Sequence, residues 1–579
     1  MRLRRHANLL ESSLKHVSTR PLLSSQWNRH SFSTTTDGAQ QEIAVLGGGI
    51  TGLASAYYIS KEFPRARITI YEAGPRLGGW LHSTHVEVPG GRVLFEHGPR
   101  TLRTGLSSLV TSHLVQELGL IGDTIYTSKI APSALNRFIY YPDHLVRMPS
   151  PGISFFDIAQ MLLSEPVFRG LFTGALMEIF RDGRPSALSD ESVGSFFSRR
   201  VDPRVANNLV SALIHGIYAG DVWQLSVKSL FPLPWYYEGQ EGSIARGLYE
   251  RTLRPDGAPL AMMPARDRDM IMDFKNQKLE PEFERSLAAC SVFSFRNGIQ
   301  QLVDRLAETL QKNDQIAIKL NTPVKHLEME DNNGKKVKIS TQSRDSVSSK
   351  DIIVSAISSN ALSNLCTSDS KTQLPALAQT HAVTVMVVNL FFSKSGLLPV
   401  EGFGYLIPQS VPFEQNPERA LGVIFDSDAI KGQDTVDGTK LTVMLGGHWW
   451  DGWSCYPSEE EGINMARTLL ARHLQITDEP TVARAKLQKD CIPQYTVGHE
   501  ERIQRAHSQL RNSFGGRLRV VGNSYNGVGV NDCLRAARDI AKGLHEGAGY
   551  EPSRTGLDHF LGEKQWVAQG SLRKGNIGS

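Results

Sequence analysis

Long apolar runs are missing from this sequence of 579 residues, and so are the short motifs of metal enzymes. No stretch approaches the roughly 18 consecutive apolar residues that predict a transmembrane helix. The 17 histidines contain no H-E-x-x-H pattern, and the five cysteines contain no C-x-x-C pair. The sequence therefore predicts no metal site and no disulfide framework. Its cysteines are expected to be free thiols, mostly buried, and no catalytic dyad or triad stands out.

A strong net charge is also lacking, because the formal charge is +4 and its excess lies at the amino end. Residues 1–33 hold six basic side chains and one acid, so the rest of the chain is nearly neutral and gives no sign of nucleic-acid binding. This Arg-rich, Ser-rich segment is typical of a mitochondrial transit peptide, with a disordered basic tail as the alternative. We expect processing near Phe32-Ser33 and exclude residues 1–38 from the fold.

The stretch from Ile43 to Glu72 has the pattern of one βαβ unit. An apolar run at 43–46 leads into Gly47-Gly48-Gly49-Ile50-Thr51-Gly52, then a helical pattern, then a second apolar run at 68–71. Such glycines allow a tight turn and bring a diphosphate close to the helix N-terminus. Glu72 is placed to accept hydrogen bonds from ribose hydroxyls, which argues against a 2′-phosphate. We expect a dinucleotide site, with a purely structural turn as the alternative.

Further motifs carry a family resemblance. Leu77-Gly78-Gly79-Trp80 resembles the second signature of the amine-oxidase-like flavoproteins, although Gly-Gly is also a common surface turn. Two further motifs follow, Gly98-Pro99-Arg100-Thr101 and the late segment 491–496, C-I-P-Q-Y-T. The succession of these motifs is similar to that of the protoporphyrinogen oxidase family. The resemblance extends over about residues 42–545 and departs from the family pattern at Asn297 and Ser358.

That resemblance implies one non-covalent FAD per chain and an oxygen-consuming oxidation of protoporphyrinogen IX to protoporphyrin IX, with hydrogen peroxide as by-product. This reaction is the penultimate step of haem biosynthesis, and flavin N5 is expected to carry the chemistry without a catalytic side chain. The residues expected to bind FAD are Gly47, Gly48, Gly49, Ile50, Thr51, Gly52, Glu72, Ala73, Gly79, Trp80, Gly98, Pro99, Arg100, Thr101, Val324, Val528, Gly529 and Val530.

The substrate is a flat apolar macrocycle with two propionates, so its pocket should be apolar with a cationic anchor. Arg137, within N-R-F-I-Y, resembles the family's propionate-binding residue, and a structural ion pair is the alternative role. Phe403, Leu406 and Met444 match family residues that sandwich the tetrapyrrole, although Phe, Leu and Met on strands are more often plain core.

The predicted fold class is α/β with α+β insertions: a Rossmann-like FAD domain, a strand-rich substrate domain and a helical membrane-contact domain. The segment 525–533 is expected to open an amphipathic helix that runs to about His545, with Asn531 or Asp532 as its N-cap. The FAD domain is expected to consist of three segments, 39–129, 291–360 and 486–546. Between them we expect the helical domain at 130–240, an exposed charged excursion at 241–290 and the substrate domain at 361–485. The transit peptide is expected at 1–38 and a disordered tail at 547–579.

Two other functions remain open, namely a flavin oxidase of amines or carotenoid precursors and a non-catalytic binding protein like the Rab GDP-dissociation inhibitors. The expected partners are the tetrapyrrole, oxygen and a membrane surface contacted by residues 153–180, for which an ordinary packed subdomain is the alternative. A homodimer and product transfer to ferrochelatase are further candidates. The expected location is the mitochondrial inner membrane, peripheral or monotopic, on the intermembrane-space face.

Overall fold

The computed structural model describes residues 40–252, 260–330, 336–342, 347–366, 372–546, 553–562 and 566–570. The predicted transit peptide, residues 1–38, lies outside the described residues. The chain divides after Gln40, and the following description concerns the unit that begins at Gln41.

A parallel five-stranded sheet forms the first layer, in the order β11-β2-β1-β15-β21. Its first strand, β1, carries the Ile-Ala-Val-Leu run whose side chains are almost fully buried on both faces, as a sheet covered by helices requires. The strands are β1 (Glu42–Leu46), β2 (Arg67–Tyr71), β11 (Ile316–Lys319), β15 (Ile352–Ser355) and β21 (Leu518–Val520).

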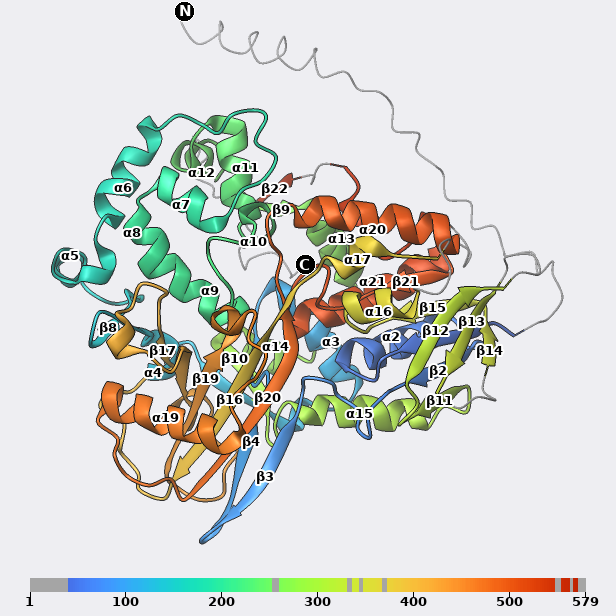
Figure 1. The fold of residues 1–579 in the computed structure, drawn as a ribbon, viewed down its shortest axis with the longest axis horizontal. Helices are drawn as coiled ribbons and strands as arrows, with labels where there is room; N and C mark the ends of the chain where they lie inside the picture. Colours follow the sequence, from blue (N-terminus) through green and yellow to red (C-terminus); the bar gives the residue numbers. More distant parts are fainter. Residues whose placement is uncertain are drawn as a thin grey trace, which may run out of the picture. The chain divides into compact units, whose positions relative to one another are not determined.

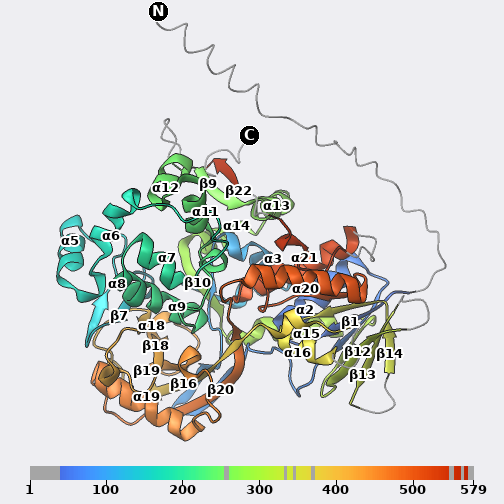
Figure 2. The ribbon, with the colours of Figure 1, turned by 45° about the horizontal axis from the view of Figure 1, so that its top comes forward.

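Helices cover both faces of this sheet. On one side the apolar stripes of α2, α15 and α21 join the strands in one core, and on the other side α16 and α20 pack against Ala44, Leu46 and Ile353. Figures 1 and 2 show α21 beside α2, in agreement with their shared core. The helices are α2 (Ile50–Glu62), α15 (Gln300–Gln311), α16 (Ser359–Leu365), α20 (His499–Phe514) and α21 (Val530–Glu546).

A seven-stranded sheet forms the second layer, in the order β20-β16-β19-β18-β17-β7-β8. Its members β7 and β8 come from the segment predicted to be helical, because Phe138 and Tyr140 bury their rings beside Tyr405 of β17. The α/β fold class is confirmed. The strands are β7 (Phe138–Tyr140), β8 (Leu145–Arg147), β16 (Ala382–Phe392), β17 (Gly404–Leu406), β18 (Ala420–Phe425), β19 (Thr439–Gly446) and β20 (Val482–Pro493).

A group of helices lies next to this second sheet, as both ribbon views show. Its core holds Val193, Phe196 and Ile214, and buried ion pairs join Glu178 and Glu238 to Arg200. Within the described residues, no helix combines the length and the apolar character needed to cross a membrane. The helices are α5 (Phe155–Ser164), α6 (Leu171–Met177), η4 (Glu178–Phe180), α7 (Val193–Arg200), α9 (Ser211–Tyr218), α11 (Pro232–Glu241) and α12 (Ile244–Thr252).

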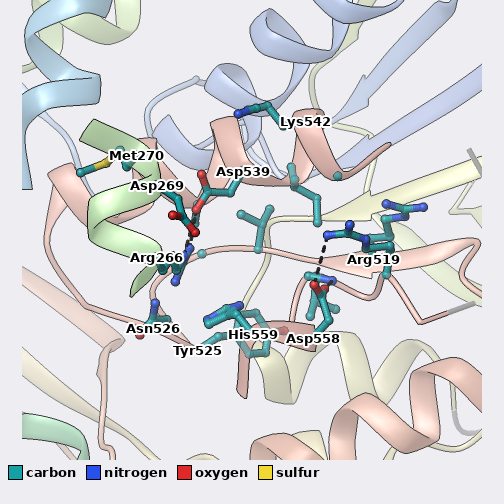
Figure 3. Close-up of a pocket in the computed structure, with 18 of the residues that line it drawn as sticks. Arg266, Asp269, Met270, Arg519, Tyr525, Asn526, Asp539, Lys542, Asp558 and His559 are labelled. Atoms are coloured by element: carbon teal, nitrogen blue, oxygen red, sulfur yellow. Dashed lines mark hydrogen bonds and ion pairs between the residues drawn. The ribbon is translucent and has the colours of Figure 1, made fainter. Parts of the chain in front are cut away.

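Residues 260–290 are folded, which differs from the exposed excursion that the sequence predicts. The helices α13 (Ala265–Phe274) and α14 (Pro281–Ala289) bury Met270, Phe274 and Phe283 in the core beside the five-stranded sheet. An ion pair between Arg266 of α13 and Asp539 of α21 borders a cavity of about 350 Å³ (Figure 3). The charges of this segment therefore pair with α21, and sequence composition could not show that.

The described part of the tail also has a defined structure, whereas the sequence predicts disorder for 547–579. Leu557 and Phe560 are buried against the core around α20. Strand β22 (Trp566–Gly570) pairs antiparallel with β9 (Leu260–Pro264). The predicted disorder is thus wrong for 553–562 and 566–570, because these residues supply apolar side chains and backbone pairing to the fold.

Three smaller sheets complete the fold. One is the hairpin of β3 (Ser83–Val88) and β4 (Gly91–Glu96), whose strands pair antiparallel across the Pro89-Gly90-Gly91 turn. The others are β5 (Leu102–Arg103) with β10 (Cys290–Phe295) and β6 (Thr124–Ser128), and β12 (Val324–Met329) with β13 (Val337–Thr341) and β14 (Val347–Lys350).

Candidate active site

The first glycine turn joins β1 to α2 in the geometry of a phosphate-binding loop. Gly47 has φ +98°, and no side chain caps the N-terminus of α2 after Gly49. The first N–H groups of α2 therefore remain available to a ligand, and the helix dipole favours an anion there. Gly52 has no substitute, since an added Cβ would lie 1.9 Å from the Gly47 oxygen.

Glu72, which follows β2, lies against this turn. Its Oε2 accepts a hydrogen bond from the Gly48 N–H at 2.7 Å, and its Oε1 accepts one from the Gly74 N–H at 2.7 Å. The carboxylate is held at the carboxyl ends of β1 and β2, which is where nucleotides bind in such sheets. Glu72 therefore lies beside the first glycine turn, and its contact with a ribose stays a prediction.

The second glycine turn lies directly on the first. The Gly78 N–H donates to the Gly48 oxygen at 2.9 Å, and a Cβ on Gly79 would come within 3.2 Å of the Gly49 Cα. A Cβ on Gly98 would in turn collide with the Trp80 oxygen at 2.2 Å. The three glycine-containing motifs therefore pack closely through their backbones. The sides of these segments that do not contact one another can bind a long ligand.

Arg100 supplies a donor that has no protein partner. This side chain is 5% exposed, and its Nη1 donates to Asp426 of α18 (Asp426–Ala429) and to Thr442 of β19. Its Nη2 is buried and, among the described residues, lacks a hydrogen-bond partner. A buried donor of this kind fits an electron-rich ligand such as a flavin.

The first turn of α21 borders the same region. The side chain of Asn531 accepts from Thr111 at 2.7 Å and donates to the Arg103 oxygen at 3.1 Å. Asp532 accepts from the Gly529 N–H at 3.1 Å. Because α21 begins at Val530, both side chains belong to its first turn, and the predicted N-cap role is wrong for each. Val324, on β12, is partly buried against the core that includes Ala44, Leu46 and Ile353 of the first sheet.

Two predicted substrate residues lie on one face of the seven-stranded sheet. Leu406 pairs in register with Gly422, and Gly422 pairs with Met444, so all three point to the same face. Leu406 and Met444 are each only partly buried. Because neighbouring strands lie about 4.8 Å apart, the backbones of Leu406 and Met444 lie roughly 10 Å apart, with Gly422 between them. The Leu406 side chain leans toward Gly422, since a Cβ there would lie 3.2 Å from its Cδ2. We refer to these three residues as the Leu406–Gly422–Met444 row.

The same face meets the FAD domain. Asn389 donates to the Glu96 oxygen at 3.1 Å and Gln488 donates to the His97 oxygen at 2.7 Å. Together with the Arg100–Thr442 bond, these contacts hold residues 96–100 against the sheet that carries the row, and this segment includes Gly98, Pro99 and Arg100 of the predicted flavin site. The arrangement allows a flat ligand on the row to face a cofactor held by the glycine turns.

Arg137 and Phe403 form the third group. The Arg137 guanidinium lies over the Phe403 ring, 5.6 Å from its centroid. Partial burial lowers the pKa of Arg137, and the charge of Arg103 lowers it further. Neither arginine takes part in an ion pair within the described residues, so the salt-bridge alternative for Arg137 has no support there. Sequence reasoning missed Arg103, although it lies three residues after Arg100.

Glu96 is a buried carboxyl at the same junction. It accepts from the Ser83 hydroxyl at 2.7 Å and from the Ile299 N–H at 2.8 Å. Burial, partly offset by these bonds, raises the pKa of Glu96 to about 7. The folded-state pKa exceeds the unfolded value of about 4.3, so Glu96 stabilises the fold most when protonated.

We therefore expect the stability that Glu96 contributes to fall as the pH rises from about 5 to about 8. Glu96→Gln stays neutral, and its Tm should decline less over this interval than that of the unmodified chain. The readout is thermal unfolding at pH 5 and pH 8, with Glu87→Gln on the exposed side of the same hairpin as control. Equal pH slopes for all three proteins would show that Glu96 titrates normally.

Comparison with known proteins decides the family. The model of the flavin containing amine oxidoreductase family matches residues 50–545. The chain belongs to that family. Its cofactor is FAD, which the two glycine turns, Glu72 and the Arg100 donor fit. The individual residue roles stay predictions.

Relatives of this family member span nearly its full length. Protoporphyrinogen oxidase of Schizosaccharomyces pombe is 36% identical over 87% of this chain and 98% of the relative. The human protoporphyrinogen oxidase is 33% identical over 86% of this chain and 97% of its own length. A crystal structure of an Exiguobacterium protein, 23% identical, covers 88% of this chain and 99% of its own with a TM-score of 0.67, which supports the fold.

Proposed function

We propose that this flavoprotein oxidises protoporphyrinogen IX to protoporphyrin IX with molecular oxygen and forms hydrogen peroxide. The observation that carries the proposal is the similarity to protoporphyrinogen oxidases over nearly the whole of their length. The site supports it, because an apolar face with an arginine at its margin suits a flat macrocycle with carboxylates.

The chain's own residues provide binding and orientation. The N-terminus of α2 is suited to the diphosphate, and Glu72 to the ribose of the adenine half. Bound FAD supplies the two-electron acceptor of the reaction. Arg100, held by Asp426 and Thr442, ties the flavin-binding segment to the substrate sheet, so cofactor and substrate surfaces are fixed relative to each other.

Substrate orientation would come from opposite ends of the site. The Leu406–Gly422–Met444 row contacts the macrocycle face and excludes water, while Arg137, and Arg103 beside it, receive propionates. An arginine stacked on Phe403 has fewer conformations available, which favours a fixed ion pair with the ligand.

The purified full chain should test this assignment through its flavin spectrum. Under anaerobic conditions, protoporphyrinogen should bleach the oxidised flavin band, whereas primary amines should not. Bleaching by amines alone would support an amine oxidase, and a protein without any flavin band would support a non-catalytic binding role.

We also propose that the chain binds a membrane surface through α5, α6 and η4. Apolar side chains on these neighbouring elements are unusually exposed: Phe156 75%, Leu163 84%, Phe172 66%, Leu176 62% and Phe180 75%. Contiguous exposed apolar groups of this size are typical of interaction sites, and an amphipathic surface can lie in the bilayer interface. Import through residues 1–33 and attachment to the mitochondrial inner membrane, on its intermembrane-space face, belong to the same proposal.

Replacing Phe172 and Phe180 by Asp should weaken binding to anionic phospholipid vesicles at least about tenfold, because each buried ring contributes roughly 1.5–3 kcal/mol. Co-sedimentation with vesicles measures this loss. The matched control is Val347→Asp, whose side chain is 52% exposed on the distant strand β14. Equal sedimentation of all three proteins would contradict the assignment of this surface.

A further inference from the structure

Two histidines that the sequence did not single out are hydrogen-bonded to each other at the substrate face. His215 lies on α9, and His448 lies in the turn η7 (Gly447–Trp450) that follows β19. Their Nε2 atoms are 2.9 Å apart. His215 is 3% exposed, whereas His448 is only partly buried. The pair therefore links a buried residue of α9 to a more accessible residue in the turn after β19.

The hydrogen bonds define which nitrogens carry protons. His215 Nδ1 lies 2.6 Å from the Ile407 carbonyl oxygen, which can only accept, so Nδ1 is protonated. His215 Nε2 must then accept the bond from the N–H of His448 Nε2. His448 Nδ1 is left as a lone pair, and no bond to it occurs within the described residues. One end of the pair is thus an available base.

The surroundings keep both rings neutral. Burial lowers the pKa of His215 to about 3 and that of His448 to about 4. Asp221 and Asp451 act in the opposite direction on His448, and Arg419 adds to the lowering. The Gln409 side-chain nitrogen donates to Asp221 at 3.0 Å. It lies 3.2 Å from His448 Nε2, but with the assigned tautomer both nitrogens are donors and form no hydrogen bond with each other. The pair therefore enters a reaction uncharged and able to accept one proton.

The elements that carry the pair, α9 and η7, border the two ends of the Leu406–Gly422–Met444 row. A Cβ on Gly216, the residue after His215, would come within 2.9 Å of the Leu406 side chain. At the other end, the backbone N–H of His448 donates to the backbone oxygen of Ala219 at 2.8 Å. Ala219 packs in one cluster with Met444 and Trp449. A macrocycle on the row would accordingly lie next to His448.

We propose that His448, positioned by His215, accepts the proton that the macrocycle releases at each two-electron step. Over the three steps, two of these protons leave pyrrole nitrogens and one leaves the remaining methylene carbon, which yields a porphyrin with two N–H groups. This inference rests on the proposed function. In a pyrrole-deprotonating step, a methylene C–H bond breaks and its electron pair leaves as hydride to FAD. The neighbouring N–H bond breaks in the same step, its electrons remain in the ring system, and the proton forms a bond to His448 Nδ1, so no free cation accumulates. Because the N–H becomes strongly acidic as positive charge develops on the ring, a weak neutral base is sufficient.

His215 assists without taking a second charge. Once His448 is protonated, its Nε2–H still donates to the neutral His215, and such a charge-assisted bond is stronger than the one before it.

His473 provides the contrast on the opposite face of the same sheet. Its Nε2 bonds to the Gln415 oxygen and its Nδ1 to the Tyr405 hydroxyl, so both nitrogens are committed. It is buried and its pKa is also about 4, which makes it a matched control.

The test is anaerobic stopped-flow reduction of the flavin by protoporphyrinogen, using the full FAD-loaded chain. His448→Asn keeps a donor toward His215 but cannot take a proton, and His448→Phe removes both functions. Both variants should reduce their flavin about 100-fold more slowly, with normal FAD content and little change in KM. Added imidazole should restore part of the rate in a concentration-dependent way. His473→Phe should lower Tm without any imidazole response.

Flavin reduction by folded, FAD-loaded His448→Asn within about threefold of the unmodified rate would overturn the inference, and so would a slow variant that imidazole does not restore. If the unmodified chain fails to reduce its flavin with protoporphyrinogen, the proposed function itself fails. The two failures are therefore distinguishable in the same experiment.

Discussion

Glu72→Ala should lose FAD on extensive dialysis, with an affinity roughly 10- to 150-fold lower than that of the unmodified chain. The free-energy loss behind this range is about 1.5–3 kcal/mol, the contribution of a hydrogen bond to a charged group. The structure adds a second reason, because the same carboxylate holds the Gly48 and Gly74 N–H groups in the phosphate-binding turn. The variant loses both the ribose acceptor and the support of the turn.

Titration of the apoprotein with FAD, followed by quenching of flavin fluorescence, measures the affinity. Glu72→Gln retains an acceptor for one N–H group and should lie between the other two proteins. Glu308→Ala removes an acid that is 57% exposed on α15 and should bind FAD normally. Full FAD retention by Glu72→Ala would assign the ribose to another residue.

Arg137→Ala should raise the KM for protoporphyrinogen roughly 30-fold while leaving the flavin spectrum unchanged. Loss of a desolvated Arg–carboxylate pair costs about 2–5 kcal/mol, and the solvent access of Arg137 favours the lower end of about 2 kcal/mol. Its position over Phe403 and outside the glycine turns explains why FAD binding should not change. If the anchor also fixes the hydride-donating carbon, kcat should fall as well.

Arg137→Lys should recover only part of the loss, because an ammonium cannot form a two-pronged contact with a carboxylate. Arg147→Ala, on the neighbouring strand β8, is the control for a general change in surface charge. An unchanged kcat/KM for Arg137→Ala would indicate that the propionate is held elsewhere, with Arg103 as the next residue to replace.

Local patterns predicted the parts of the site that lie within one short stretch of chain. The βαβ unit around Gly47 and the hairpin ending at Glu96 follow from apolar periodicity and turn residues, which depend on neighbours only a few positions away. The resemblance then brought Leu406 and Met444 into the substrate site. Pairing with Gly422 explains how two distant residues share one face.

What sequence reasoning missed depends on contacts between distant segments. His215 and His448 are 233 positions apart, and each alone has the pattern of an ordinary buried histidine. Likewise, α13 looks like an exposed charged segment until Arg266 and Asp267 meet Asp539 and Arg535 of α21. Such charge pairing has no periodic signature in either segment, so only the tertiary structure shows it.

Oxygen consumption and porphyrin fluorescence, recorded together on the purified full chain supplied with protoporphyrinogen, test the central claim most directly. The account predicts fluorescent porphyrin, released FAD after denaturation, and three molecules of oxygen consumed for each molecule of porphyrin formed. A flavin-loaded, folded chain that forms porphyrin no faster than the spontaneous reaction in buffer would contradict it.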